Sequence, residues 1–399
     1  MKVRTNPPIH LTYCLNIHPG ETWEENFAAI RDHAVRVRDR VAPGTPFGLG
    51  LRLSESAGTE LFAENDKLDA FRKYLNDAGM YVFTINGFPY GRFHGTAVKA
   101  DVYAPDWRSE DRQMYTVGLA HILARLLPEG VTGSISTVPV AYRPWITGEA
   151  DLRAAAAMLA ETLMALRGFE RQTGRLIRLA LEPEPDCFIE TTDQAIAALS
   201  GQLREFALQH LDRRCRLPAD ATGEAWDRHI GVCLDTAHAT VEFEDPAESV
   251  AKLRAAGVPL AKVQLSSALR VKPTAEGLDR LEAFVDAVYL HQVKARTAEG
   301  TIVSFPDLPE ALAAARADTG RFEELRVHFH VPLFYEGDEA FGSTSSLLTR
   351  ELIDSAAAGG CDHFEIETYT FNVLPAHLRL PDVADSIARE YEWVMGRLI

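Results

Sequence analysis

Short apolar runs alternate along the chain with longer segments in which apolar residues recur every three or four positions. The second pattern is typical of amphipathic helices and is clear in 23–41, where Phe27, Ile30, Ala34 and Val37 follow one another at these steps. The short runs have the length and bulk of buried strands. They are residues 10–18, 47–54, 81–87, 133–140, 176–185, 229–238, 260–268, 324–334 and 362–371.

The alternation of strands and helices predicts a parallel sheet, and the loop after the first strand indicates whether that sheet closes into a barrel. Repeated strand–helix–strand units form parallel sheets with right-handed crossovers, either as an open doubly wound sheet or as a barrel. The open form usually carries a glycine-rich phosphate loop after its first strand, whereas here the first strand runs into NIHPGETWEEN. No GxxxxGK[ST] motif occurs either. We therefore expect an α/β fold, a (β/α)8 TIM barrel, formed by residues 1–399 as a single domain.

Two insertions are expected to interrupt the barrel. One covers about 87–111, after the third strand, and the other covers about 270–323, after the seventh, with a hairpin between two helices. Nine strand candidates are one more than the ring holds, and which strand among 260–334 lies outside it stays open. Loops that follow barrel strands build the catalytic face, so the first insertion is predicted to be a lid or substrate wall.

Composition and charge narrow the possible partners. The formal net charge of −16 argues against a nucleic-acid binder, which needs a basic face, and against binding to an anionic membrane surface. The five cysteines are scattered without a CxxC pair, which fits a reducing compartment. No apolar stretch reaches the roughly 18 residues of a membrane helix, and no signal peptide is apparent. We expect a cytoplasmic protein with a small-molecule partner, and a homo-oligomer is possible.

Carboxylates stand at the ends of several predicted strands. Glu182 and Glu367 follow apolar runs, and Asp235 directly follows Val232 to Leu234, with His238 three residues later. A buried ionised acid is costly unless it is paired or binds a metal. These positions correspond to the carboxyl ends of barrel strands, where catalytic groups gather.

The converging acids predict a divalent metal site. Three carboxylates at one barrel mouth repel one another, and a cation removes that repulsion. Oxygen ligands with one imidazole or amide suit Mn²⁺ or Mg²⁺ best, with Zn²⁺, Co²⁺ or Fe²⁺ as alternatives. Glu182, Asp235 and Glu367 are the predicted carboxylate ligands, and the fourth is either Gln264 or His330. His330 is a candidate if the 324–334 strand belongs to the ring.

This pattern resembles the xylose-isomerase-like, or AP-endonuclease-2-like, barrels. A Glu on a late strand, D-x-x-H on the next, then His or Gln, and a final Glu resemble that family's metal ligands, which fall on Glu182, Asp235, Gln264 and Glu367. His238 corresponds to the family's helper histidine. The departure is Gln264, where many relatives have His, and this puts the fourth ligand in doubt.

A second resemblance covers nearly the whole chain. The phrases HLTYCLNIHPGETW, NGFPYGRFHG, LALEPEP, CLDTAHA, VHFHVPLF and EIETYTFNVLP look like the bacterial metabolite-traffic protein family EboE. Its members are expected to be sugar-isomerase-like barrels with poorly defined chemistry. The resemblance therefore implies the fold more strongly than the reaction.

The leading functional hypothesis is a metal-dependent isomerase or epimerase of a sugar, polyol or cyclitol-like metabolite. Glu182 and Glu367 would move a proton between carbons through a metal-stabilised enediolate, and His238 would orient the site. The alternatives are a non-catalytic metabolite-binding or traffic barrel and a metal-dependent hydrolase. The residues predicted to contact the substrate are Asn16, His18, Arg52, Phe93, His94, Lys99 and Trp107.

Overall fold

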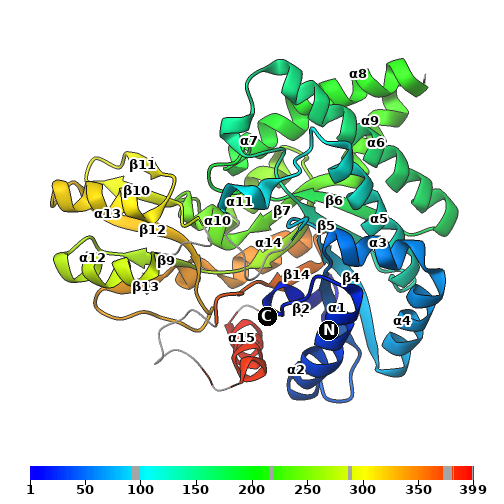
Figure 1. Ribbon diagram of the computed structural model, residues 1–399, viewed down its shortest axis with the longest axis horizontal. Coiled ribbons are helices and arrows are strands. Elements are labelled where there is room, and N and C mark those ends of the chain that lie inside the picture. The colour runs from blue at the N-terminus through cyan, green and yellow to red at the C-terminus, as the bar shows by residue number, and fades with distance from the viewer. Residues whose placement is uncertain (92–98, 216–218, 286–289, 372–379, 381, 398) are drawn as a thin grey trace.

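A ring of parallel strands forms the centre of the molecule (Figure 1). The computed structural model describes residues 1–91, 99–215, 219–285, 290–371, 380, 382–397 and 399. The strands of the main sheet follow the order β1-β2-β14-β8-β7-β6-β5-β4-β3. They are β1 (Lys2–Thr5), β2 (Pro8–Tyr13), β3 (Phe47–Arg52), β4 (Met80–Asn86), β5 (Gly133–Thr137), β6 (Ile177–Leu181), β7 (Ile230–Asp235), β8 (Leu260–Leu265) and β14 (His363–Ile366).

The two open edges of the ring are β2 and β3, and they lie close enough together that the ring is nearly closed. Every neighbouring pair from β2 round to β3 is parallel, whereas β1 pairs with β2 as an antiparallel hairpin outside the ring. A parallel bridge from Cys14 to Gly50 links the two open edges. The Thr12 hydroxyl adds a 2.9 Å hydrogen bond to the Gly48 carbonyl oxygen across the same seam. The predicted α/β barrel is therefore confirmed.

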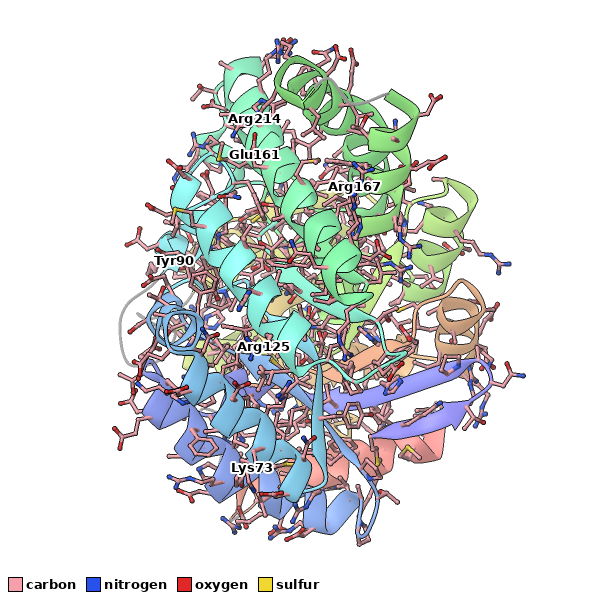
Figure 2. All side chains as sticks on the ribbon, turned by 90° about the vertical axis from the view of Figure 1, so that its right-hand side faces the viewer. Lys73, Tyr90, Arg125, Glu161, Arg167 and Arg214 are labelled. Atoms are coloured by element: carbon pink, nitrogen blue, oxygen red, sulfur yellow. The ribbon has the colours of Figure 1, made fainter. Side chains whose placement is uncertain are left out.

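Helices cover the outside of the ring. Each apolar face packs on the strands, and Figure 2 shows polar side chains of α5, α6 and α8 on the outer surface, where Arg214 pairs with Glu161 at 2.8 Å. Among the described residues, no helix has the length and apolar character needed to cross a bilayer. The covering helices are α1 (Trp23–Ala29), α2 (Val35–Val41), α3 (Glu55–Ala63), α4 (Asn65–Asp77), α5 (Glu110–Leu126), α6 (Glu149–Thr173), α7 (Thr192–Ala197), α8 (Leu203–Cys215), α9 (Ala219–His229), α11 (Pro246–Ala255), α14 (Arg350–Ala358) and α15 (Val383–Arg397). The short helix α10 (Thr236–Val241) directly follows β7, and all its residues are buried.

A second, antiparallel sheet projects from the barrel, on the left in Figure 1. Its strand order is β11-β10-β12-β9-β13, and helices α12 (Ala275–Leu281) and α13 (Leu308–Ala317) accompany it. The strands are β9 (Ala268–Val271), β10 (Val293–Thr297), β11 (Ile302–Phe305), β12 (Phe322–His330) and β13 (Phe341–Ser343). The hairpin expected within this insertion is β10–β11.

The surplus strand is β12. It pairs with β10 and β9 in the second sheet, and the ring passes from β8 directly to β14. The second sheet therefore runs from Ala268 to Ser343, wider than the expected 270–323. The apolar run of β12 is buried against this sheet, and a run of that kind does not reveal which of two sheets it joins.

Candidate active site

Three carboxylates meet at the carboxyl ends of the barrel strands. Glu182 follows β6, Asp235 ends β7 and Glu367 follows β14, so three strands from one part of the ring bring them together. One oxygen of each lies within 4.8 Å of one oxygen of each of the others, and all three side chains are buried. We name these three residues the acid centre. Two ligands about 2.4 Å from one cation are at most about 4.8 Å apart, so a single ion fits among them.

Asp235 is oriented by its position before helix α10. Its Oδ1 accepts hydrogen bonds from the backbone N–H groups of Ala237 (2.7 Å) and His238 (2.9 Å) and from the Ser266 hydroxyl (2.6 Å). Its Oδ2 is buried without a hydrogen-bond partner. These bonds leave Oδ2 as the oxygen available to a ligand, because Oδ1 is already saturated.

Glu367 is held by two amides, one from the turn after the neighbouring strand β2 and one from β4. Asn16, in the turn after β2, donates to Glu367 Oε1 at 2.7 Å, and Asn86, at the end of β4, donates to the same oxygen at 3.0 Å. Asn86 in turn accepts from the Phe88 backbone N–H at 3.1 Å. The carboxylate is thereby fixed by neutral donors, which leave its charge uncompensated.

Three histidines lie next to the acid centre. His238 comes from α10, whereas His328 and His330 come from β12 of the second sheet. His238 Nδ1 lies 3.8 Å from Glu182 and 3.5 Å from Glu184, and its Nε2 lies 3.9 Å from Asp235 Oδ1. The barrel and the insertion therefore both contribute side chains to one cluster.

A small cavity of about 60 Å³ opens onto this cluster. That volume has room for a few water-sized groups. No Lys or Arg is present among the described residues that line it. They are Asn16, Asn86, Phe88, Pro89, Val102, Glu182, Glu184, His238, His328, His330, Glu367 and Tyr369.

Burial dominates the protonation of the cluster. Burial, together with repulsion from Asp235, raises the pKa of Glu182 well above its usual range. Burial, together with repulsion from Glu182, does the same to the pKa of Glu367. Burial also lowers the pKa of His238 to about 4 and that of His328 well below its usual range. Without a bound cation these four side chains thus favour their neutral forms, since the charged forms have lost their hydration.

The donor set fits a divalent cation. Glu182 Oε2, Asp235 Oδ2 and the Nε2 atoms of His328 and His330 are all buried without a hydrogen-bond partner. Each such polar atom costs free energy when it is left unpaired, and four of them face one cluster. Carboxylate oxygens with imidazoles are the ligands that Mn²⁺, Fe²⁺, Co²⁺ and Zn²⁺ accept in proteins. The buried cluster of His and Glu is thus suited to a divalent metal.

The two predicted fourth ligands differ in their access to the cavity. Gln264 lies on ring strand β8, but its Oε1 accepts from the Cys233 thiol at 2.9 Å, and it does not line the cavity. His330 lines the cavity although its strand lies outside the ring. The condition that we set for His330, a place for its strand in the ring, is not met, and β12 brings its side chain to the cavity from the second sheet instead.

The predicted substrate-contacting residues are dispersed. Asn16 lines the cavity, whereas His18 hydrogen-bonds Tyr13 through its Nε2 at 3.0 Å and stacks on His33. Arg52 is buried and bonds the carbonyl oxygens of Gly20 and Gly91.

Two more of these residues lie away from the cavity, and two cannot be placed. Trp107 is fully buried in the core. Lys99 forms an exposed ion pair with Asp307 of the insertion at 3.0 Å. Phe93 and His94 lie outside the described residues.

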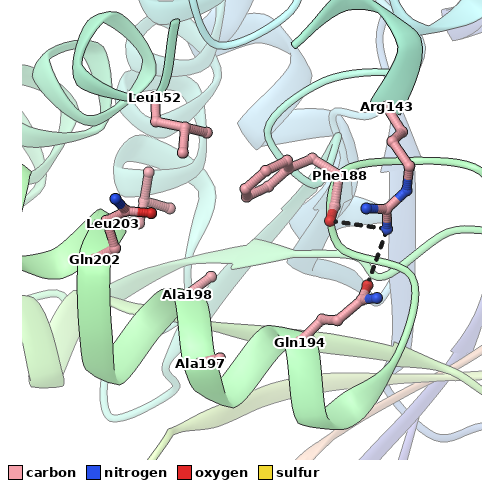
Figure 3. Close-up of a pocket in the computed structure, with 8 residues that line it drawn as sticks. All are labelled: Arg143, Leu152, Phe188, Gln194, Ala197, Ala198, Gln202 and Leu203. Atoms are coloured by element: carbon pink, nitrogen blue, oxygen red, sulfur yellow. Dashed lines mark hydrogen bonds between the residues drawn. The ribbon is translucent and has the colours of Figure 1, made fainter. Parts of the chain in front are cut away.

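A larger pocket of about 240 Å³ lies elsewhere, between α6 and α7 (Figure 3). Its lining is mostly apolar, and its one cation, Arg143, donates to the Phe188 carbonyl oxygen and to Gln194, both at 3.2 Å. Arg143 also pairs with Glu190 at 2.9 Å. This pocket lacks the clustered carboxylates and imidazoles of the acid centre, so we place the chemistry at the smaller cavity.

Several residues of the site were not predicted from the sequence. Asn86 is a polar residue at the end of an apolar strand, and the same pattern identified the three carboxylates of the acid centre. Tyr103 and Gln292 gave no such signal, because they lie in the two insertions. Gln292 donates to the Tyr103 hydroxyl at 2.9 Å, and that hydroxyl donates to Glu184 at 3.2 Å, so the two insertions meet beside the acid centre.

Comparisons with known proteins give distant structural likenesses. No protein-family model matches the chain, and no curated protein matches it. The probable 3-DHS dehydratase AsbF of Bacillus anthracis is 15% identical, covers 98% of this chain and 99% of its own, and has a TM-score of 0.48. The IOLI protein with a binding zinc atom is 12% identical, with coverages of 98% and 99% and a TM-score of 0.47.

A third structure, of a D-tagatose 3-epimerase-like protein, is 11% identical, with coverages of 97% and 98% and a TM-score of 0.46. Likenesses at this level do not assign a reaction to this chain. The comparisons do not show the EboE family. The assignment of the barrel rests on the strand order and its parallel pairing.

Proposed function

We propose that this protein is a divalent-metal-dependent isomerase or epimerase of a small polyhydroxylated carbonyl compound. The observation that carries the proposal is the acid centre, where Glu182, Asp235 and Glu367 converge at the mouth of the barrel. A cation held there supplies positive charge next to a substrate oxygen when a neighbouring C–H proton is removed. Glu182, Asp235 and Glu367 would hold the ion, and a substrate with adjacent hydroxyl and carbonyl oxygens would meet its charge at the cavity.

The polar lining of the cavity supports an uncharged, hydroxyl-rich substrate. Hydroxyl groups both donate and accept, and the lining offers amides, imidazoles and carboxylates for both purposes. Phosphate recognition normally uses Arg or Lys, and neither is present among the described lining residues. Glu182 and Glu367 come from well-separated strands of the ring, which suits transfer of a proton between two faces of a small substrate.

Metal content tests the acid centre directly. We expect the purified protein to retain a divalent cation, and Asp235→Asn and Glu367→Gln each to lose most of it, because each removes one carboxylate ligand. Glu390→Gln is the matched control, since Glu390 is a buried acid outside the centre, and it should keep the metal. Full occupancy in both acid-centre variants would show that the cation does not bind there.

Proton exchange tests the reaction. Polyhydroxylated aldehydes and ketones incubated with the metal-loaded protein in D₂O should gain deuterium next to the carbonyl group, as read by proton NMR. Glu367→Gln should abolish the exchange. Binding of a ligand without exchange would support a carrier instead, and cleavage of an ester without exchange would support a hydrolase.

A further inference from the structure

We propose that His238, His328 and His330 form a second cation site, which we name the histidine centre, and that it suits Zn²⁺. One ring nitrogen from each lies within 4.8 Å of one from each of the others. The ring centroids are 4.6 Å apart for His238 and His328, 5.6 Å for His238 and His330, and 5.5 Å for His328 and His330. Three imidazole nitrogens at these separations can share one ion.

The hydrogen bonds of the three rings prepare them as ligands. His238 Nδ1 lies 3.0 Å from the Pro183 carbonyl oxygen, and His330 Nδ1 lies 2.9 Å from that of Glu367. A carbonyl oxygen only accepts, so Nδ1 must carry the proton in both rings. The lone pair of each neutral ring is therefore on Nε2, the arrangement found in metal-binding histidines.

His328 is oriented in the same way by a side chain. Its Nδ1 lies 2.9 Å from Gln292 Oε1, and Gln292 Nε2 donates to the Tyr103 hydroxyl and to the Pro185 carbonyl oxygen, at 3.2 Å for the latter. These two donations fix the amide so that its oxygen faces His328. His328 thus donates from Nδ1 and also keeps its lone pair on Nε2.

Two of the Nε2 atoms make no hydrogen bond in the described part of the chain. The Nε2 atoms of His328 and His330 are buried without a hydrogen-bond partner, and the two residues are 8% and 1% exposed. An imidazole whose Nδ1 proton is bonded and whose Nε2 is buried without a partner lacks only an electrophile at Nε2. Three imidazoles with one open position are a ligand set typical of catalytic Zn²⁺.

The histidine centre adjoins the acid centre in the same cavity but uses a different set of ligands. Its ligands come from α10 and β12, whereas the carboxylates come from β6, β7 and β14, and Asp235 Oδ1 lies 3.9 Å from His238 Nε2 between the two groups. In this arrangement His330 serves the histidine centre, and the acid centre keeps positions open for substrate oxygens. A negative acid centre beside it would also offset the charge of a second ion.

Titration of the metal-free full-length protein with Zn²⁺, followed by elemental analysis after desalting, tests this proposal. We expect two equivalents per chain in the wild type. His328→Asn and His330→Asn should each reduce this to one. Asparagine can still donate from the position of Nδ1 but has no Nε2, so these variants remove the ligand atom and keep the structural hydrogen bond.

His229→Asn is the matched control, because its buried ring bonds the Ile177 carbonyl oxygen through Nδ1 at 2.8 Å far from the site. It should retain two equivalents. One equivalent in the wild type at saturating Zn²⁺, or two in both histidine variants, would overturn the histidine centre. Loss of one equivalent in Glu367→Gln but none in the histidine variants would support the acid centre alone, and the reverse result would support the histidine centre alone.

Discussion

Below the acid centre, the barrel interior contains a buried ion pair. Lys262 Nζ lies 2.5 Å from Glu365 Oε2, and both side chains are fully buried. Gly50 makes room for the carboxylate, because a Cβ at that position would lie 1.8 Å from Glu365 Oε1. Removing two charges from water costs free energy, and only the attraction between the two partners offsets this cost. The loss of one partner therefore destabilises the folded state.

We expect Lys262→Met to lower the free energy of unfolding by about 3–5 kcal/mol, because an unpaired carboxyl group remains in the barrel. Urea denaturation followed by circular dichroism measures the loss. The double variant Lys262→Met/Glu365→Leu should recover most of it, since no buried charge then remains.

Lys73→Ala serves as the control for this prediction. Its exposed ammonium group pairs with Asp77 on the surface of α4 (Figure 2). Its removal should leave the unfolding midpoint unchanged within error, because exposed ion pairs contribute little. A double variant no more stable than Lys262→Met would refute the explanation by charge.

At the scale of elements, β10 is tied to the barrel by one lysine. Lys294 is almost fully buried and pairs with Glu190 (2.9 Å), Glu242 (3.0 Å) and Asp186 (3.3 Å), which lie in the loop after β6 and in the turn after α10. This contact joins the second sheet to the loop that carries Glu184.

Lys294→Gln should therefore loosen the second sheet without unfolding the ring. We expect faster amide hydrogen exchange in 183–190 and in β10, because three carboxylates lose their shared cation. Exchange in β6 and β7 should stay at the wild-type rate. Equal acceleration in the ring strands would mean that the network stabilises the whole molecule instead.

Helix α15 is linked to the barrel mouth by a buried carboxyl group. Glu390 Oε1 accepts from the Leu333 backbone N–H at 3.0 Å and from the Thr368 hydroxyl at 2.7 Å. Burial raises the pKa of Glu390 to about 8. The folded state therefore binds a proton that the unfolded state releases near pH 4.5, and stability contributed by this group falls as pH rises from there to about 8.

We expect Glu390→Gln to remove this dependence, because glutamine is neutral and its amide oxygen can accept both hydrogen bonds. The variant should exceed the wild type in free energy of unfolding by a small amount at pH 5. This difference should grow toward pH 8, by at most about 1.4 kcal/mol per pH unit. Thermal unfolding at several pH values measures it. A constant difference across this range would exclude Glu390 as the titrating group.

The sequence predicted where the ring strands lie along the chain better than it predicted which strands pair with one another. Hydrophobic periodicity located each ring strand and placed Glu182, Asp235 and Glu367 at strand ends, because local spacing determines which face a side chain occupies. It could not assign 324–334 to a sheet, since strand pairing depends on distant residues. For the same reason Tyr103 and Gln292 stayed unrecognised, because their importance comes from a contact between two insertions.

At the scale of the whole molecule, a cation at the barrel mouth should couple the two sheets. The carboxylates of the acid centre follow or end β6, β7 and β14 of the ring, and the neighbouring imidazoles of β12 line the same cavity. Any ion that binds only the folded state stabilises it by mass action, by about 2.7 kcal/mol at one hundred times its dissociation constant.

We therefore expect Mn²⁺ to raise the thermal unfolding midpoint and a chelator to lower it. The rise should be lost in Glu367→Gln, and hydrogen exchange in β12 should slow when the ion is added to the wild type. A rise of equal size in Glu367→Gln would place the stabilising ion elsewhere on the protein.

The location of β12 has a consequence for how this protein can change. Ring strand β8 contributes Gln264 to the barrel interior, whereas two of the three imidazoles that line the cavity are supplied by β12, a strand that the ring does not need for closure. The side chains that line the mouth therefore come from two separable parts of the chain. Exchange of the segment from Ala268 to Ser343 would replace two of the imidazoles, while the carboxylates of the acid centre keep their scaffold. Such a graft is a route by which evolution or an engineer could diversify one barrel.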